Sequence, residues 1–137
     1  MKKVLVLCTG NSCRSQIAHG FLNYYTNDSV KIYSAGIEKH GLNINAIKCM
    51  QEVGIDISQH TSNKLGEYID IDFDFIITVC DNANETCPIF PSNSVKIHKN
   101  FKDPTKLLNG KYGEHFISTR DKIKDFICQF VNKYLTV

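Results

Sequence analysis

The sequence lacks the long apolar run that a membrane-spanning helix requires. No stretch approaches the roughly 20 apolar residues needed to cross a bilayer. Met1-Lys2-Lys3 leads directly into an apolar segment, so we expect neither a membrane anchor nor a signal peptide. The chain also lacks a run of lysine and arginine, and its formal net charge is only +2. We therefore expect no binding to nucleic acid.

Internal repeats and low-complexity segments are also missing from the 137 residues, which suit one domain over residues 1–137. With 42% apolar and 22% charged residues, the composition is typical of a soluble globular protein, and we expect a monomer. A chain of this length has no need of disulfide staples despite its six cysteines. We therefore expect a cytoplasmic protein whose cysteines either pack in the core or carry chemistry.

Short apolar segments alternate with segments of helical periodicity. The former predict strands over residues 4–7, 30–35, 73–79 and 95–98, and the latter predict helices over residues 15–26, 42–53 and 114–135. This alternation predicts a parallel sheet covered on both faces, whose ligands bind beyond the carboxyl ends of the strands. Cys8, Cys80 and Asp103 each follow a predicted strand, so we expect them at one edge of the sheet.

The segment from Cys8 to Ser15 follows the first predicted strand and precedes the first helix. A strand, a loop of small residues and a helix N-terminus form an anion-binding arrangement, because free backbone N–H groups converge there. A thiol at the mouth of such a loop predicts a nucleophilic cysteine that faces a tetrahedral oxyanion.

The pattern Cys8-x5-Arg14 resembles the phosphate loop of low-molecular-weight protein tyrosine phosphatases. Four further segments resemble the thioredoxin-coupled arsenate reductases of that fold: Ser34-Ala35-Gly36, Asp56–Ser62, Cys80–Pro88 and Phe101–Pro104. The resemblance covers nearly the full chain. It implies an α/β fold, a single three-layer domain with a four-stranded parallel sheet of order 2-1-3-4 flanked by helices.

The resemblance also implies a reaction, the reduction of arsenate to arsenite in arsenic detoxification. Cys8 attacks arsenate and forms a thiol–arsenate adduct, and Cys80 then attacks the Cys8 sulfur as arsenite leaves. Cys87 next attacks Cys80, and thioredoxin, the electron donor, reduces the Cys80–Cys87 disulfide. Arg14 holds the oxyanion, Asp103 is the general acid and Ser15 donates to the Cys8 thiolate. The implied oxyanion-binding residues are Thr9, Gly10, Asn11, Ser12, Cys13 and Arg14.

Elementary chemistry limits what activation of Cys8 contributes. The helix N-terminus and Arg14 should lower the pKa of this thiol from its usual value near 8.5. Lowering the pKa by ~2 units raises the thiolate fraction about 25-fold but costs roughly 8-fold in nucleophilicity. Most of the catalysis must therefore come from the loop N–H groups and the planar fork of Arg14, which hold and stabilise the oxyanion.

The spacing of Cys80 and Cys87 predicts a conformational change. If residues 81–86 are helical in the reduced protein, the Cα atoms of these two cysteines lie about 10 Å apart. A disulfide needs less than ~7 Å, so oxidation must rearrange this segment.

Two other functions stay open at this point. The first is a phosphatase for phosphotyrosine or small phosphate esters that uses Cys8, Arg14 and Asp103, although Thr105-Lys106 stand where such enzymes carry tyrosines. The second is a regulatory oxyanion or redox sensor. For Cys80 and Cys87 the bland alternative is two structural cysteines, and a zinc site is disfavoured because their spacing lacks short ligand pairs. We expect Cys13, Cys49 and Cys128 to be packing residues.

The sequence departs from the family at a cation site. Members that bind potassium near the loop use an asparagine, a glutamate, a threonine and an aspartate. Asn11 and Thr61 match, but His19 and Asn63 stand at the other two positions. We therefore expect weak or absent potassium dependence, no metal and no tightly bound cofactor. We expect His19 on an exposed helix face. The sequence shows no pairing for the remaining histidines, which we expect at the surface or at caps: His40, His60, His98 and His115.

Overall fold

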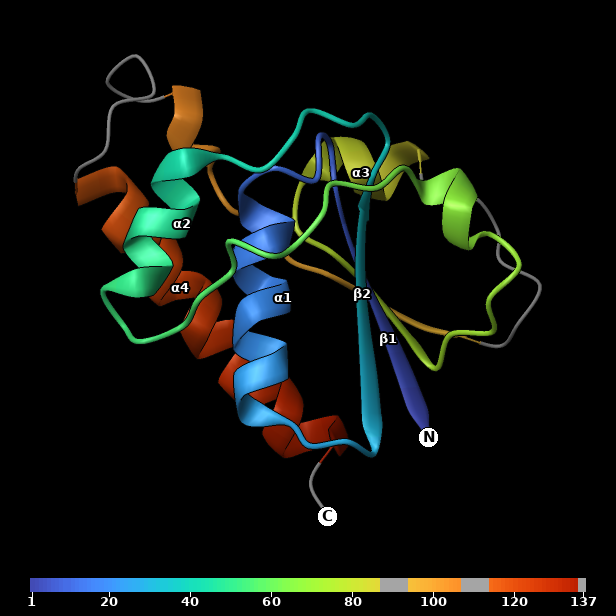
Figure 1. The fold of residues 1–137 in the computed structure, drawn as a ribbon. Helices are drawn as coiled ribbons and strands as arrows, with labels where there is room; N and C mark the ends of the chain where they lie inside the picture. The colour runs from blue at the N-terminus through green and yellow to red at the C-terminus, as the bar shows by residue number, and fades with distance from the viewer. Residues whose placement is uncertain (87–93, 107–113, 136–137) are drawn as a thin grey trace.

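The computed structural model describes residues 1–86, 94–106 and 114–135. Its centre is a four-stranded parallel sheet in the order β2-β1-β3-β4, which confirms the predicted topology (Figure 1). The strands are β1 (Lys2–Cys8), β2 (Val30–Gly36), β3 (Phe75–Thr78) and β4 (Val95–His98). In β1 the residues from Val4 to Leu7 are fully buried, because the strand lies between β2 and β3 and is covered on both faces.

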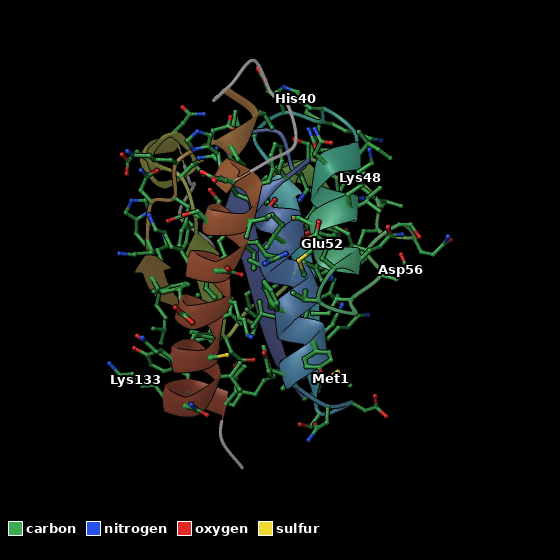
Figure 2. All side chains as sticks on the ribbon, turned by 90° about the vertical axis from the view of Figure 1, so that its left-hand side faces the viewer. Met1, His40, Lys48, Glu52, Asp56 and Lys133 are labelled. Carbon is green, nitrogen blue, oxygen red and sulfur yellow. The ribbon has the colours of Figure 1, made fainter. Side chains whose placement is uncertain are left out.

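Three helices cover one face of the sheet: α1 (Arg14–Tyr25), α2 (Ile44–Gln51) and α4 (Glu114–Phe130) (Figures 1 and 2). The last turn of α4 continues as the π-helix η4 (Val131–Leu135). Helix α2 is shorter than the predicted range 42–53, because the Asn43 side chain accepts hydrogen bonds from the N–H groups of Asn45 and Ala46 and so caps the helix.

The opposite face carries the 3-10 helix η1 (Leu65–Tyr68), whose Tyr68 ring contacts that of Tyr33 in β2 at 5.1 Å between centroids. Two further short helices follow strands at the carboxyl edge: α3 (Asp81–Thr86) and η2 (Pro104–Lys106). The helices within the described ranges include none that is long and apolar enough to cross a membrane.

Candidate active site

The carboxyl ends of the strands form the upper edge of the molecule in Figure 1, and the predicted site residues gather there. Cys8 ends β1, Cys80 lies two residues beyond β3, and Asp103 follows β4 and precedes η2. A cavity of about 210 Å³ at this edge is lined by Cys8, Thr9, Gly10, Ser12, Cys13, Arg14, His40, Asp103 and Thr105. The structure thus brings together most of the residues that the resemblance implies for oxyanion binding.

Asn11 lies behind the loop instead of lining this cavity. It is fully buried and is the one non-glycine residue with positive φ, at 50°, in the described part of the chain. Its Nδ2 donates to Ser15 Oγ at 2.8 Å, and its Oδ1 accepts from the Asn63 N–H at 2.8 Å. These bonds stabilise a backbone conformation that costs an L-residue energy. Asn11 therefore shapes the loop from behind.

Arg14 is held by the segment that follows β4. Its Nη1 donates to the Phe101 carbonyl oxygen at 2.9 Å, and its Nη2 lies 3.7 Å from Asp103 Oδ2. The other carboxylate oxygen of Asp103 accepts from the N–H and the hydroxyl of Thr105, at 3.0 and 2.6 Å. The guanidinium is therefore oriented over the loop by a carbonyl and a carboxylate before any oxyanion arrives.

The side chains of Cys8 and Cys80 contact each other, although the two residues are 72 positions apart in the sequence. Both thiols are buried, with 4% and 3% exposure. Thr9 Oγ1 lies 3.3 Å from Cys80 Sγ, and the Ala83 N–H donates to the same sulfur at 3.4 Å. The hydrogen bond from Cys8, together with Thr9 and Ala83, lowers the pKa of Cys80 to about 5.

The same interaction has the opposite effect on the first cysteine. The hydrogen bond to Cys80 and burial raise the pKa of Cys8 well above its usual value, and Arg14 offsets only part of this. The sequence predicts a lowered pKa for Cys8, which is wrong: the contact with Cys80 raises the pKa of Cys8, and it is the pKa of Cys80 that is lowered. The reason is that two buried thiols in contact do not both ionise, and Cys80 has the better donors.

Residues 81–86 are helical, which is the condition for the predicted rearrangement on oxidation. Cys87 lies outside the described residues, so the expected separation from Cys80 stays a prediction. Cys13 and Cys49 are buried, as expected for packing residues, and burial raises the pKa of both thiols, to about 11 for Cys49. Cys128 is half-buried on α4.

The expectation that His19 lies on an exposed helix face is wrong, and the structure gives partners to four histidines: His19, His40, His60 and His98. His19 packs against His60, with ring centroids 4.4 Å apart, and its Nδ1 lies 2.8 Å from Ser34 Oγ. His40 Nε2 and Glu38 Oε2 are 2.6 Å apart, and His98 Nε2 is 2.8 Å from Asp81 Oδ1. These partners lie on different elements or in loops, so helical periodicity alone does not reveal them.

The cavity also contains two residues that the sequence does not single out, His40 and Thr105. His40 follows β2 at the same edge of the sheet as Cys8, at the top of Figure 2. Cys80 and Asp103 were selected because each lies just beyond a strand. The same criterion would have selected His40.

The positions that match the family's potassium ligands do not fit a cation here. Asn11 O and Thr61 O both accept hydrogen bonds from Gln16 Nε2, at 3.0 and 2.9 Å, and Thr61 Oγ1 donates to Asn63 Oδ1 at 2.7 Å. His60 Nδ1 lies 3.0 Å from Gln16 Oε1. Over residues 1–86, 94–106 and 114–135, no three histidine, cysteine or acidic side chains form a metal-binding group. The carbonyl oxygens of Asn11 and Thr61 thus already accept hydrogen bonds from the Gln16 side chain.

Exchanging sodium for potassium at constant ionic strength should therefore leave the rate of turnover unchanged. The double substitution His19→Glu/Asn63→Asp restores two carboxylates near Asn11 and Thr61, and its rate should become sensitive to potassium. Initial rates in the two salts measure this. A severalfold potassium stimulation of the unsubstituted protein would contradict the prediction.

The histidine pair should make the fold sensitive to acid. Burial and the neighbouring His60 lower the pKa of His19 to about 3, whereas an unfolded histidine titrates near 6.5. The unfolded chain therefore binds a proton that the folded chain does not, and stability falls as the pH falls below about 6.5. Between pH 7 and pH 5, His19 alone should lower the free energy of unfolding by about 2 kcal/mol.

Urea unfolding at the two pH values measures this loss. His19→Gln should make it smaller, because glutamine does not titrate, while His115→Gln on α4 should leave it unchanged. An equal loss in the His19 variant and the unsubstituted protein would show that another group is responsible.

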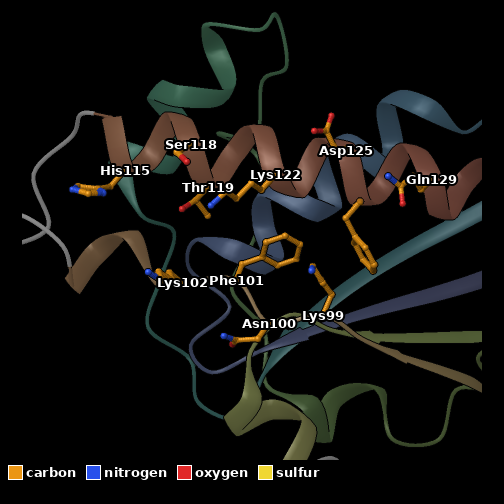
Figure 3. Close-up of a pocket in the computed structure, with 11 residues that line it drawn as sticks. Lys99, Asn100, Phe101, Lys102, His115, Ser118, Thr119, Lys122, Asp125 and Gln129 are labelled. Carbon is orange, nitrogen blue, oxygen red and sulfur yellow. The ribbon is translucent and has the colours of Figure 1, made fainter.

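A larger groove of about 710 Å³ lies between α4 and the segment after β4 (Figure 3). Its lining includes three lysines, Lys99, Lys102 and Lys122, but no cysteine. Phe101 lines this groove with its ring, while its carbonyl oxygen orients Arg14. We place the chemistry in the smaller cavity because the thiols and the guanidinium are there.

The chain is similar to known proteins over nearly its full length. A model of the low molecular weight phosphotyrosine protein phosphatase family matches residues 3–135. The chain is 46% identical over 132 residues to arsenate reductase 1 of Staphylococcus epidermidis, which covers 96% of this chain and 97% of that protein. It is similar to a solved arsenate reductase in the phosphate binding state, with a TM-score of 0.80, 30% identity and coverage of 97% and 98% of the two chains.

Its fold is also similar to that of a thioredoxin-dependent arsenate reductase from Corynebacterium glutamicum, with a TM-score of 0.76 and 24% identity over 97% of this chain and 61% of that one. From residue 3 to residue 135, the chain therefore belongs to the low molecular weight phosphotyrosine protein phosphatase family.

Proposed function

We propose that this protein reduces arsenate to arsenite and takes its electrons from thioredoxin. The observation that carries the proposal is the contact between Cys80 and the oxyanion loop. A phosphatase needs one thiol, but here a second one lies against Cys8 with its pKa lowered to about 5. The relatives named arsenate reductase support the same function.

In the first step, the oxyanion binds to the loop N–H groups and Arg14, the Cys8 thiol gives its proton to an oxygen of the bound oxyanion, and the Cys8 sulfur bonds to arsenic as one oxygen leaves. The developing negative charge on Cys8 is stabilised by Arg14 and by the Ser15 hydroxyl, which has already accepted a bond from Asn11. Asp103, once protonated, gives its proton to the departing oxygen. Its carboxylate sits 3.7 Å from Arg14 and is thereby held at the cavity.

In the second step, the Cys80 thiolate attacks the Cys8 sulfur. The sulfur–arsenic bond breaks and its electron pair stays on arsenic, so arsenic(V) becomes arsenic(III) and arsenite leaves. The two cysteines are oxidised to a disulfide. Cys87 then attacks Cys80 and frees Cys8, and thioredoxin reduces the Cys80–Cys87 disulfide. This cycle needs a reducing compartment, in agreement with a cytoplasmic protein.

A coupled assay tests the proposal: arsenate-dependent consumption of NADPH in the presence of thioredoxin and thioredoxin reductase. Arsenate should sustain many turnovers. Hydrolysis of p-nitrophenyl phosphate should be slow, because the same loop accepts a phosphate ester. Rapid ester hydrolysis without NADPH consumption would favour the alternative, a phosphatase that uses Cys8, Arg14 and Asp103.

A further inference from the structure

His40 forms part of the wall of the oxyanion cavity. Its N–H donates to the Gly10 carbonyl oxygen at 3.0 Å, and its side chain packs closely against Gly10. A Cβ at Gly10 would collide with His40 Nδ1 and lie 2.6 Å from its Cγ. Glycine is therefore required at this position by the close approach of the imidazole, and the Nδ1 edge of the ring faces the loop.

Glu38 determines which nitrogen of His40 carries the proton. Its Oε2 lies 2.6 Å from His40 Nε2, and a carboxylate only accepts hydrogen bonds. Nε2 is therefore protonated, and in the neutral ring Nδ1 has a lone pair. The charged groups that share the cavity with this ring are Arg14 and Asp103.

The loop otherwise offers an oxyanion mostly donors, namely backbone N–H groups and Arg14. One carboxylate oxygen of Asp103 accepts two hydrogen bonds from Thr105, and the other forms an ion pair with Arg14 at 3.7 Å. Near neutral pH, arsenate and phosphate each keep an O–H group that needs an acceptor, whereas sulfate has none. His40 Nδ1 supplies an acceptor at the wall of the cavity.

We propose that His40 is a substrate-binding and specificity-determining residue, which accepts a hydrogen bond from the O–H of the bound oxyanion and so favours arsenate and phosphate over sulfate. This inference rests on the proposed function only for the identity of arsenate. Its chemical content, a preference for a protonated oxyanion, concerns inorganic phosphate and sulfate equally and is measurable without any turnover.

The test is calorimetric titration of the protein with sodium phosphate and with sodium sulfate at about pH 8, where phosphate still carries one O–H group and sulfate carries none. His40→Ala should weaken phosphate binding about 10-fold and change sulfate binding little, because one hydrogen bond to a charged ligand is lost. His40→Phe keeps a ring over Gly10 but has no acceptor, so it should lose as much phosphate affinity as alanine does.

Glu38→Gln provides a second arm. The glutamine amide can either accept from Nε2–H or donate to Nε2, so the ring proton is no longer fixed at Nε2 and Nδ1 is an acceptor only part of the time. Sulfate affinity should then rise relative to phosphate affinity. In the coupled assay, His40→Ala should raise the KM for arsenate about 10-fold and leave kcat nearly unchanged.

Equal losses of phosphate and sulfate affinity in His40→Ala would show that the residue acts as a cation or as a wall, and would overturn the proposal. Unchanged phosphate affinity, or an unsubstituted protein that binds sulfate as tightly as phosphate, would also overturn it. If the anion preference responds to His40 but arsenate is not reduced, the proposed function fails and this inference stands. If arsenate is reduced but the preference for phosphate over sulfate does not change in the His40 variants, this inference fails and the proposed function stands.

Discussion

Replacement of Cys80 by serine should abolish turnover of arsenate while leaving hydrolysis of p-nitrophenyl phosphate measurable. Without the second thiol, Cys8 can still attack an oxyanion, but no sulfur is placed to attack the Cys8 adduct and release arsenite. Ester hydrolysis needs only Cys8, the loop, Arg14 and Asp103. The two activities should therefore separate in one variant, with NADPH consumption falling to the uncatalysed level.

The same variant should change the ionisation of Cys8. In the unsubstituted protein, contact with Cys80 raises the pKa of Cys8, and a serine carries no negative charge. The midpoint of Cys8 alkylation by iodoacetamide should therefore move to lower pH in Cys80→Ser. Cys128→Ser on α4 is the matched control and should leave both activities and this midpoint unchanged. Sustained arsenate turnover by Cys80→Ser would contradict the disulfide cascade.

Replacement of Arg14 by lysine should lower kcat/KM for arsenate by about 10²–10³-fold, although the positive charge is kept. The guanidinium contacts Phe101 O through Nη1 and approaches Asp103 through Nη2, so its plane is oriented at the cavity. A lysine ammonium cannot bond two oxyanion oxygens in parallel while it holds this orientation. The loss should appear equally in arsenate reduction and in ester hydrolysis, because both begin with oxyanion binding.

Arg120→Lys separates this effect from a loss of stability. Arg120 is a buried arginine of α4 that donates to the Cys49 carbonyl oxygen and pairs with Glu52 and Asp121, away from the cavity. Its replacement should lower the free energy of unfolding by about 1–3 kcal/mol and leave kcat/KM unchanged below the unfolding temperature. An Arg14→Lys variant that keeps most of its activity would show that charge alone suffices.

The sheet and the positions of the main site residues follow from the sequence because their signals are local. Each strand is a short apolar run, and parallel strands must end at a common edge. Cys8, Cys80 and Asp103 therefore meet at that edge whatever the details of packing. The loop between Cys8 and Arg14 is likewise local, since a strand and a helix separated by small residues define its geometry.

Other features depend on contacts between residues that are distant in the chain. The lowered pKa expected for Cys8 rested on the helix N-terminus and Arg14 alone. It was wrong because β3 brings a second buried thiol, Cys80, against Cys8, and this contact raises the pKa of Cys8. The pairing of His19 with His60 joins α1 to a loop, and no periodicity encodes it. Asn11 matters through its bond from Asn63, 52 residues away, and not through contact with the oxyanion.

The sequence by itself thus determined the order of strands and helices, the oxyanion loop and the residues at the carboxyl edge, because local patterns and the geometry of parallel sheets suffice for these. Tertiary structure decided that contact with Cys80 raises the pKa of Cys8, how the strained Asn11 is stabilised, and that His40 packs against Gly10 at the cavity wall. These depend on burial and on distances of a few ångströms between separate segments, and such quantities exist only once the chain has folded.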